Sequence, residues 1–191
     1  MPLTRLASMF VPQHKLTFAM RNLVLYIANS LDNFIARENH AIDWLFSPDA
    51  FSEAFTHFES GIDTVLIGRK TYEVMLRFGE THYEGKRNIV FSRTLSSNAL
   101  IEVVRGDVVS FVRSLKSEQG KGIWLVGGGE LITLLLEAEL IDEFVFCLHP
   151  ILLGKGVPMF LPHATQTDLD FLSSTAFENG AVMLHYRRKS I

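Results

Sequence analysis

The sequence has a single cysteine and no local cluster of metal-binding side chains. Cys147 cannot form a disulfide within the chain, and because it lies in an apolar run we expect a small core residue, not a nucleophile. The seven histidines never fall within five positions of one another, so with one cysteine they offer no local metal-ligand set. The sequence therefore predicts no metal site, and the cytoplasm is the expected compartment.

An excess of either charge is also missing. The 18 basic and 21 acidic side chains are spread along the chain and leave no basic face for a nucleic-acid backbone or an anionic membrane. The first residues contain prolines and Lys15, and they lack the unbroken apolar core of a signal peptide. We interpret residues 1–20 as a loosely held or disordered extension, or as the product of an over-early start codon.

The chain has 191 residues, of which 48% are hydrophobic, and is long enough for one domain with a sizeable apolar core. We place this domain at residues 21–191. Leu23–Ala28 is a nearly continuous apolar run, typical of a central strand buried on both faces. Further strand-like runs alternate with helical patterns, and Asn179-Gly180 joins two terminal runs with a strong hairpin signal. This order predicts an α/β fold with a mainly parallel sheet and an antiparallel edge.

Three glycines form the most distinctive stretch. A short apolar strand ends at Val126, and Gly127, Gly128 and Gly129 lead into an apolar helix. Without a Cβ the backbone can approach an anion closely, and the helix start adds N–H groups and a positive dipole end. An ordinary dinucleotide fingerprint would need glycine in place of Ile132, so the stretch is either a phosphate-binding loop or a tight strand-to-helix turn.

A second strand, glycine and helix follow the same pattern at Gly68. Here Arg69 and Lys70 lie in the first turn of the helix, where the dipole disfavours cations, and a bound anion would explain them. A third apolar run ends in Ser92-Arg93, which again puts a hydroxyl and a guanidinium at the carboxyl end of a strand. The alternative is that these cations are ordinary surface charges.

Ser47-Pro48-Asp49 reads as a helix start, with Ser47 as the N-cap and Asp49 in the first turn. An apolar stripe begins at Phe51, and Gly61 is placed to end the helix. Asp49 could stabilise the helix dipole or take part in catalysis.

Together these motifs resemble the dihydrofolate reductase superfamily, in particular bacterial proteins similar to the C-terminal reductase domain of the riboflavin-biosynthesis enzyme RibD. The resemblance runs from about Arg21 to Arg188. Its motifs are Ser30-Leu31-Asp32-x-Phe34-Ile35-Ala36, Ile42-Asp43-Trp44-Leu45, Ile67–Glu73, Val126–Gly129 and Leu152–Gly156.

The resemblance implies an NADPH-dependent reductase with a three-layer fold: a twisted, mainly parallel mixed sheet, helices on both faces and a C-terminal antiparallel hairpin. It places Gly68, Arg69, Lys70 and Thr71 beside the cofactor phosphates. It places Ser92 and Arg93 near the adenosine 2′-phosphate, and Gly127, Gly128, Gly129 and Glu130 at the pyrophosphate.

The substrate side combines features of two branches. Pteridine reductases of the superfamily carry a carboxylate in the helix after the Trp motif, where Asp49 falls, whereas Leu31-Asp32 resembles the RibD-like branch. Asp49 and Asp32 are thus both candidate catalytic and substrate-binding residues, although Asp32 could equally form a turn. Trp44 and Phe51 are expected to line the pocket.

Two functions stay open on these grounds. One is hydride transfer from NADPH to a pteridine-like, a pyrimidine-like (5-amino-6-(5-phosphoribosylamino)uracil reductase type) or another small substrate; the other is nucleotide binding without turnover. We also expect a homodimer, because the terminal hairpin and the apolar loop Pro150–Phe160 offer more nonpolar surface than a small sheet edge should expose.

Overall fold

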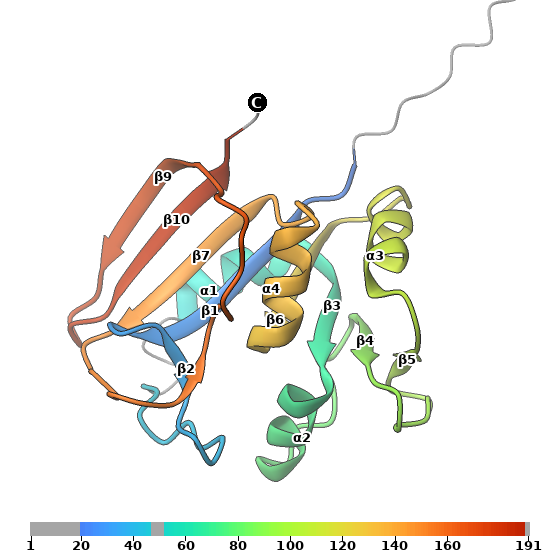
Figure 1. Cartoon of the computed structure of the whole chain (residues 1–191), viewed down its shortest axis with the longest axis horizontal. Coiled ribbons are helices and arrows are strands. Elements are labelled where there is room, and N and C mark those ends of the chain that lie inside the picture. Colours follow the sequence, from blue (N-terminus) through green and yellow to red (C-terminus); the bar gives the residue numbers. More distant parts are fainter. Residues whose placement is uncertain (1–19, 47–51, 190–191) are drawn as a thin grey trace, which may run out of the picture.

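The computed structural model describes residues 20–46 and 52–189, and within them the chain forms an eight-stranded sheet flanked by helices (Figure 1). The sheet order is β5-β4-β3-β6-β1-β7-β10-β9, and β2 and β8 form a separate small sheet. The strands are β1 (Leu23–Ser30), β2 (Phe34–Ala36), β3 (Ile62–Gly68), β4 (Arg87–Phe91), β5 (Glu102–Val104), β6 (Gly122–Gly127), β7 (Glu143–His149), β8 (Val157–Pro158), β9 (Leu169–Ala176) and β10 (Val182–Arg188). The helices are α1 (Ser52–Ser60), α2 (Arg69–Arg77), α3 (Val108–Lys116) and α4 (Gly129–Glu137).

β1 is the central strand that its apolar run predicts, and it pairs in parallel with β6 and β7. Strands β3, β4 and β5 extend the parallel part, whereas β10 is antiparallel to both β7 and β9. The turn between β9 and β10 contains Gly180 at φ 84°, a conformation that favours glycine. The α/β fold with a terminal antiparallel hairpin is confirmed.

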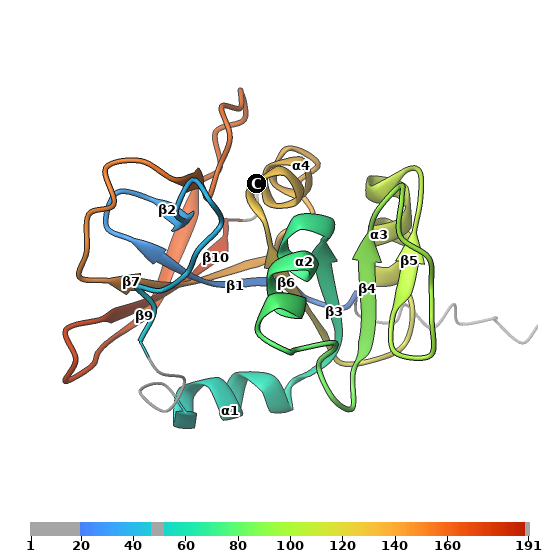
Figure 2. The same ribbon diagram turned by 90° about the horizontal axis from the view of Figure 1, so that it is seen from below.

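Two apolar cores, one on each face of the sheet, hold the helices in two layers. Val112 of α3 and Leu135 of α4 belong to the core on one face of the sheet. Tyr72 of α2, with Phe55 and Phe58 of α1, belongs to the core on the other face. Figure 2 shows α1 and α4 on opposite sides of the sheet, so the three-layer arrangement is confirmed. Cys147 lies buried in the second core, as predicted, and this burial raises the pKa of its thiol.

The β1–β6 hydrogen-bond ladder stops short of the carboxyl edge of the sheet, which leaves an opening in the pairing there. The pairing of these two strands ends at Leu25 and Leu125. On either side the ladders run further, because β1 stays paired with β7 as far as Ser30 and β3 stays paired with β6 as far as Gly127. Ligands of α/β proteins commonly bind outside the carboxyl ends of the strands.

The sequence did not predict the small β2–β8 sheet. Phe34 pairs with Pro158 and Ala36 with Val157, and Met159 N–H donates to the Asn33 carbonyl at 3.0 Å. A strand of two residues carries no readable periodicity, so the segment appeared only as an apolar loop.

Candidate functional site

Two glycine turns meet at the carboxyl ends of β3 and β6. A Cβ on Gly68 would lie 3.1 Å from the Gly127 carbonyl oxygen, and one on Gly128 would lie 3.3 Å from Thr71 Oγ1. Gly127 has φ 120°, and the Gly127–Gly128 peptide bond is cis. Because side chains at these positions would crowd the neighbouring turn, the glycines keep a bare backbone surface at the sheet edge.

Both helices that follow these turns begin without a side-chain cap. Gly68 is the N-cap of α2 and Gly128 that of α4, and neither can satisfy the first backbone N–H groups of its helix. Uncapped N–H groups and positive dipole ends on adjacent strands form an environment suited to an anion such as a pyrophosphate.

The two cations of α2 have carboxylate partners. Arg69 pairs with Glu73 at 2.5 Å and Lys70 pairs with Glu130 of α4 at 2.9 Å. A bound anion is therefore not needed to explain these cations, because the two ion pairs offset the unfavourable dipole, and the surface-charge alternative accounts for them as well. Their roles toward a cofactor stay a prediction.

Arg93 differs from them. It is exposed just beyond β4, and no ion pair joins it to any carboxylate among the described residues. The turn that carries it is shaped by Ser92, whose buried hydroxyl accepts hydrogen bonds from the N–H groups of Thr94 and Leu95 at 3.2 and 3.1 Å. Of the predicted phosphate contacts, Arg93 is the cation that has no competing partner there.

Asp32 joins the β1–β2 turn to the loop before β8. Its carboxylate accepts the Ser30 hydroxyl at 2.6 Å and the N–H groups of Leu153 and Gly154 at 3.1 and 2.7 Å. The Ser30 hydrogen bond, aided by the two backbone donors, lowers the pKa of Asp32. A carboxylate held in its ionised form is poorly suited to donate a proton near neutral pH.

On the face of the sheet that carries α1, Trp44 and His149 pack together as a wall. The sequence predicted a site role for Trp44 but not for His149. Trp44 is buried and packs edge-on against the His149 ring, with centroids 5.2 Å apart. The indole Nε1 has no hydrogen-bond partner among the described residues. A buried donor of this kind suits a ligand acceptor.

His149 ends β7 and was missed, although a polar residue that ends a buried strand was a usable signal. Its Nε2 accepts the Phe46 N–H at 3.3 Å, and its Nδ1 lies 3.1 Å from the Cys147 carbonyl oxygen. These contacts fit a neutral ring with the proton on Nδ1. Burial lowers the pKa of His149 and favours that neutral form.

Comparison with known proteins places the chain in a family. Residues 21–183 match the sequence model of the RibD C-terminal domain. The chain belongs to the RibD C-terminal domain family. It is 36% identical over 172 residues to the uncharacterized protein YwjB of Bacillus subtilis, covering 88% of this chain and 98% of that one.

Solved structures agree with this RibD C-terminal-like fold. A riboflavin biosynthesis protein (putative) from Shewanella sp. PV-4 superposes with TM-score 0.78 at 27% identity, covering 88% of this chain and 99% of the other. Dihydrofolate reductase from Enterococcus faecalis, solved with NADP(H) and RAB-propyl, gives TM-score 0.67 at 15% identity over 88% and 97% of the two chains. At that identity the second likeness shows the fold alone.

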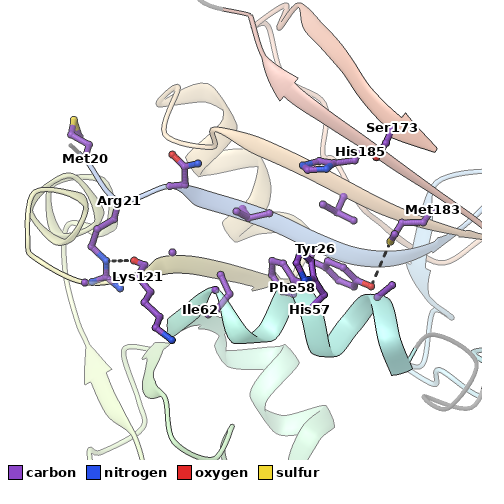
Figure 3. A pocket seen from close by; sticks show the side chains of 17 residues that line it. Met20, Arg21, Tyr26, His57, Phe58, Ile62, Lys121, Ser173, Met183 and His185 are labelled. Carbon is purple, nitrogen blue, oxygen red and sulfur yellow. Dashed lines mark hydrogen bonds between the residues drawn. The ribbon is translucent and has the colours of Figure 1, made fainter. Parts of the chain in front are cut away.

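A groove of about 670 Å³ opens elsewhere on this RibD C-terminal-like domain, between α1 and the sheet (Figure 3). It contains none of the predicted site residues, and three of its polar side chains, Arg21, Lys121 and His185, are already engaged. Arg21 binds Asp63 and Thr64, Lys121 Nζ binds the Ser60 carbonyl at 2.9 Å, and His185 lies 2.8 Å from Glu143. We therefore place the candidate site at the carboxyl edge of the sheet.

Two predicted site residues of this RibD C-terminal-like domain, Asp49 and Phe51, lie outside the described residues, as do the predicted helix start and nearly all of the N-terminal extension. Among the helices that the structure describes, none combines the length and apolar content needed to span a bilayer.

Proposed function

We propose that the protein is an NADPH-dependent reductase that transfers hydride to a C=N or C=O bond of a pteridine-like, pyrimidine-like or other small substrate. One observation carries the proposal: the β1–β6 pairing stops short of the carboxyl edge, beside the glycine turns that end β3 and β6 and the Trp44–His149 pair at the end of β7. Such an arrangement at the carboxyl edge suits a cofactor and a substrate that meet there.

The chain's own residues fit the cofactor. The uncapped starts of α2 and α4 and the bare glycine backbone suit a pyrophosphate. The guanidinium of Arg93, which has no ion-pair partner among the described residues, suits a 2′-phosphate. When bound, NADPH supplies the hydride, and the protein supplies orientation and a shielded site.

On the substrate side, the Trp44 indole N–H is a buried donor for a carbonyl oxygen or ring nitrogen. We assign Asp32 to holding the loop before β8, because its carboxylate already accepts three donors. Asp49 is our candidate for binding or protonating the substrate, as its place after the Trp motif implies.

Purified protein with NADPH and a panel of reduced and oxidised pterins and phosphoribosylated aminopyrimidines tests the proposal. We expect substrate-dependent loss of NADPH absorbance with at least one of them. Nucleotide binding by fluorescence without turnover of any tested compound would favour the alternative, a nucleotide-binding protein of the same fold.

Asp49→Asn and Asp32→Asn then separate the two carboxylates. Loss of a general acid or base lowers turnover by about 100-fold or more, which we expect for Asp49→Asn with NADPH affinity unchanged. If Asp49→Asn stays active and Asp32→Asn abolishes turnover, the pteridine-type site is wrong and a RibD-type substrate site is favoured.

A further inference from the structure

Asn29, near the end of β1, is a fully buried polar residue. Its side-chain nitrogen has hydrogen-bond partners among the described residues, whereas its side-chain oxygen has none there. Its Nδ2 donates to the Ser30 carbonyl at 3.0 Å and to Asn33 Oδ1 at 3.2 Å. Exchanging the amide nitrogen and oxygen would set Oδ1 against the Ser30 carbonyl oxygen, which cannot donate, so the Ser30 contact fixes the assignment. Oδ1 is buried and has no hydrogen-bond partner among the described residues.

A buried amide of the same chain shows the usual outcome. Asn88 is 3% exposed and uses both ends: Oδ1 accepts the Tyr83 N–H at 2.8 Å, and Nδ2 donates to the Tyr83 and Lys86 carbonyls at 2.9 and 2.8 Å. Buried acceptors without a partner cost free energy and are uncommon. Asn29 Oδ1, which has no partner among the described residues, is therefore a candidate acceptor for a donor from a ligand.

The position of Asn29 indicates which ligand. Side chains alternate along β1, so Asn29 shares a sheet face with Ile27, which belongs to the core under α3 and α4. Ile27 Cδ1 lies 3.5 Å from where a Cβ on Gly127 would be, next to the glycine turns. The Trp44–His149 wall lies on the other face. His149 is two positions after Cys147 on β7, so it shares the face of Cys147, which belongs to the second core.

We propose that Asn29 Oδ1 accepts an N–H of the nicotinamide carboxamide and so selects the reactive end of the cofactor. The inference rests on the proposed function, since it needs NADPH in the opening between β1 and β6. Asn29 lies beyond the last β1–β6 pair, on the strand that borders this opening. At the nicotinamide end of the cofactor, the carboxamide is the one group with N–H donors.

Binding to the wild-type protein tests this without any substitution. Dissociation constants are measured by fluorescence for NADP⁺, for its 3-acetylpyridine analogue, whose acetyl group has no N–H, and for adenosine 2′,5′-bisphosphate, which lacks the nicotinamide. One neutral hydrogen bond corresponds to about tenfold in affinity, so NADP⁺ should bind about tenfold more tightly than the analogue. Equal affinities would overturn the role of Asn29.

The variant Asn29→Leu then assigns the effect to this side chain. It should weaken NADP⁺ binding by about tenfold, abolish the preference over the analogue and leave the bisphosphate affinity unchanged. The control Asn88→Leu removes a satisfied buried amide far from the site, and it should lower the melting temperature while keeping the preference of the folded protein for NADP⁺.

The outcomes separate the two proposals. An unchanged NADP⁺ preference in folded Asn29→Leu contradicts the inference but leaves the reductase proposal standing. A wild-type protein that binds neither NADP⁺ nor the bisphosphate contradicts the reductase proposal itself. If Asn29→Leu does not fold, as its melting curve would show, the wild-type comparison with the analogue decides alone.

Discussion

At the scale of single residues, what distinguishes the cations of the site is whether a carboxylate already holds them. Arg69 and Lys70 are paired with Glu73 and Glu130, whereas Arg93 has no such partner among the residues that the structure describes. A guanidinium that gives up no ion pair can contribute its full charge-assisted hydrogen bonds to a phosphate. We therefore expect cofactor discrimination to depend on Arg93 more than on the α2 cations.

Replacing Arg93 by glutamine tests this expectation. Pairing with the 2′-phosphate is worth roughly 1.5 to 3 kcal/mol, so Arg93→Gln should weaken NADPH binding by more than about tenfold. NADH affinity should stay the same, because NADH has no 2′-phosphate. Fluorescence titration of both cofactors measures the ratio.

Arg69→Gln is the matched control, since it removes the same charge from a residue already engaged with Glu73. It should reduce NADPH affinity less than Arg93→Gln does. A wild-type protein that binds both cofactors equally, or a larger effect of Arg69→Gln, would contradict the assignment.

Asp32→Asn should loosen the loop before β8. The new amide nitrogen would face a backbone N–H of Leu153 or Gly154, both of which now donate to the carboxylate. We expect a lower melting temperature and faster amide exchange in residues 152–156, with Arg37→Gln as a control that breaks an exposed ion pair nearby. Unchanged exchange in this loop would rule out the holding role.

The effect of Asp32→Asn should itself depend on pH. The folded pKa of Asp32 is lowered, so its contribution to stability is present above its ordinary pKa and is lost as pH falls through the lowered folded value. The melting difference between wild type and Asp32→Asn should therefore be constant near neutral pH and shrink in acid below about pH 4. Melting curves across that range measure it.

At the scale of elements, periodic stretches were predictable and short or non-local ones were not. The apolar run of β1, the Asp107 cap of α3, whose side chain accepts the Ser110 N–H at 3.1 Å, and the hairpin turn at Gly180 are all local signals that the structure confirms. The β2–β8 pair and the Phe46–His149 hydrogen bond join segments far apart in sequence, so no local pattern indicates them.

The segment that ends at Phe46 should respond to pH through His149. Burial lowers the folded pKa of His149, so the stability that the neutral ring contributes is present above about 6.5, the ordinary value, and is lost as pH falls from there toward the folded pKa. Protonation also removes the lone pair that accepts the Phe46 N–H. We expect Trp44 fluorescence to change in this range.

Three variants test whether His149 is the group that titrates and Trp44 the residue that reports it. His149→Gln should abolish most of the transition, and Trp44→Phe should remove the signal. His185→Gln should leave it unchanged, because His185 lines the separate groove of Figure 3 and contacts Glu143. A transition that survives in His149→Gln would show that another group is responsible.

At the scale of the whole molecule, strand order decides which predicted residues meet. Gly68 and Gly127 come together because β3 and β6 are neighbours in the sheet, although 59 residues separate them in the sequence (127 − 68). The repeated strand-glycine-helix pattern predicted each turn, and the family resemblance assigned both turns to the cofactor phosphates without stating that they touch. The separation of β1 from β6 and the buried Asn29 amide depend on packing over the whole sheet, which no local pattern encodes.

The two edges of the sheet are protected unequally. β5 is three residues long and its Glu102 pairs with Arg87 at 2.9 Å. β9 is eight residues long, and its residues 171–176 carry no charge. Phe171 and Leu172 there are 59% and 39% exposed. Long uncharged edges expose unpaired backbone groups that readily pair with another chain.

We therefore propose that β9 pairs with β9 of a second copy in an antiparallel, two-fold symmetric homodimer, since such an interface buries the same edge on both chains. Light scattering at micromolar concentration should give twice the 21.6 kDa chain mass. Leu172→Lys should yield a monomer, because charge on an edge strand opposes pairing. Leu134→Lys is the matched control: Leu134 on α4 is also 39% exposed but lies away from β9, so this variant should stay dimeric. A wild-type monomer, or dissociation by both substitutions alike, would contradict the β9 interface.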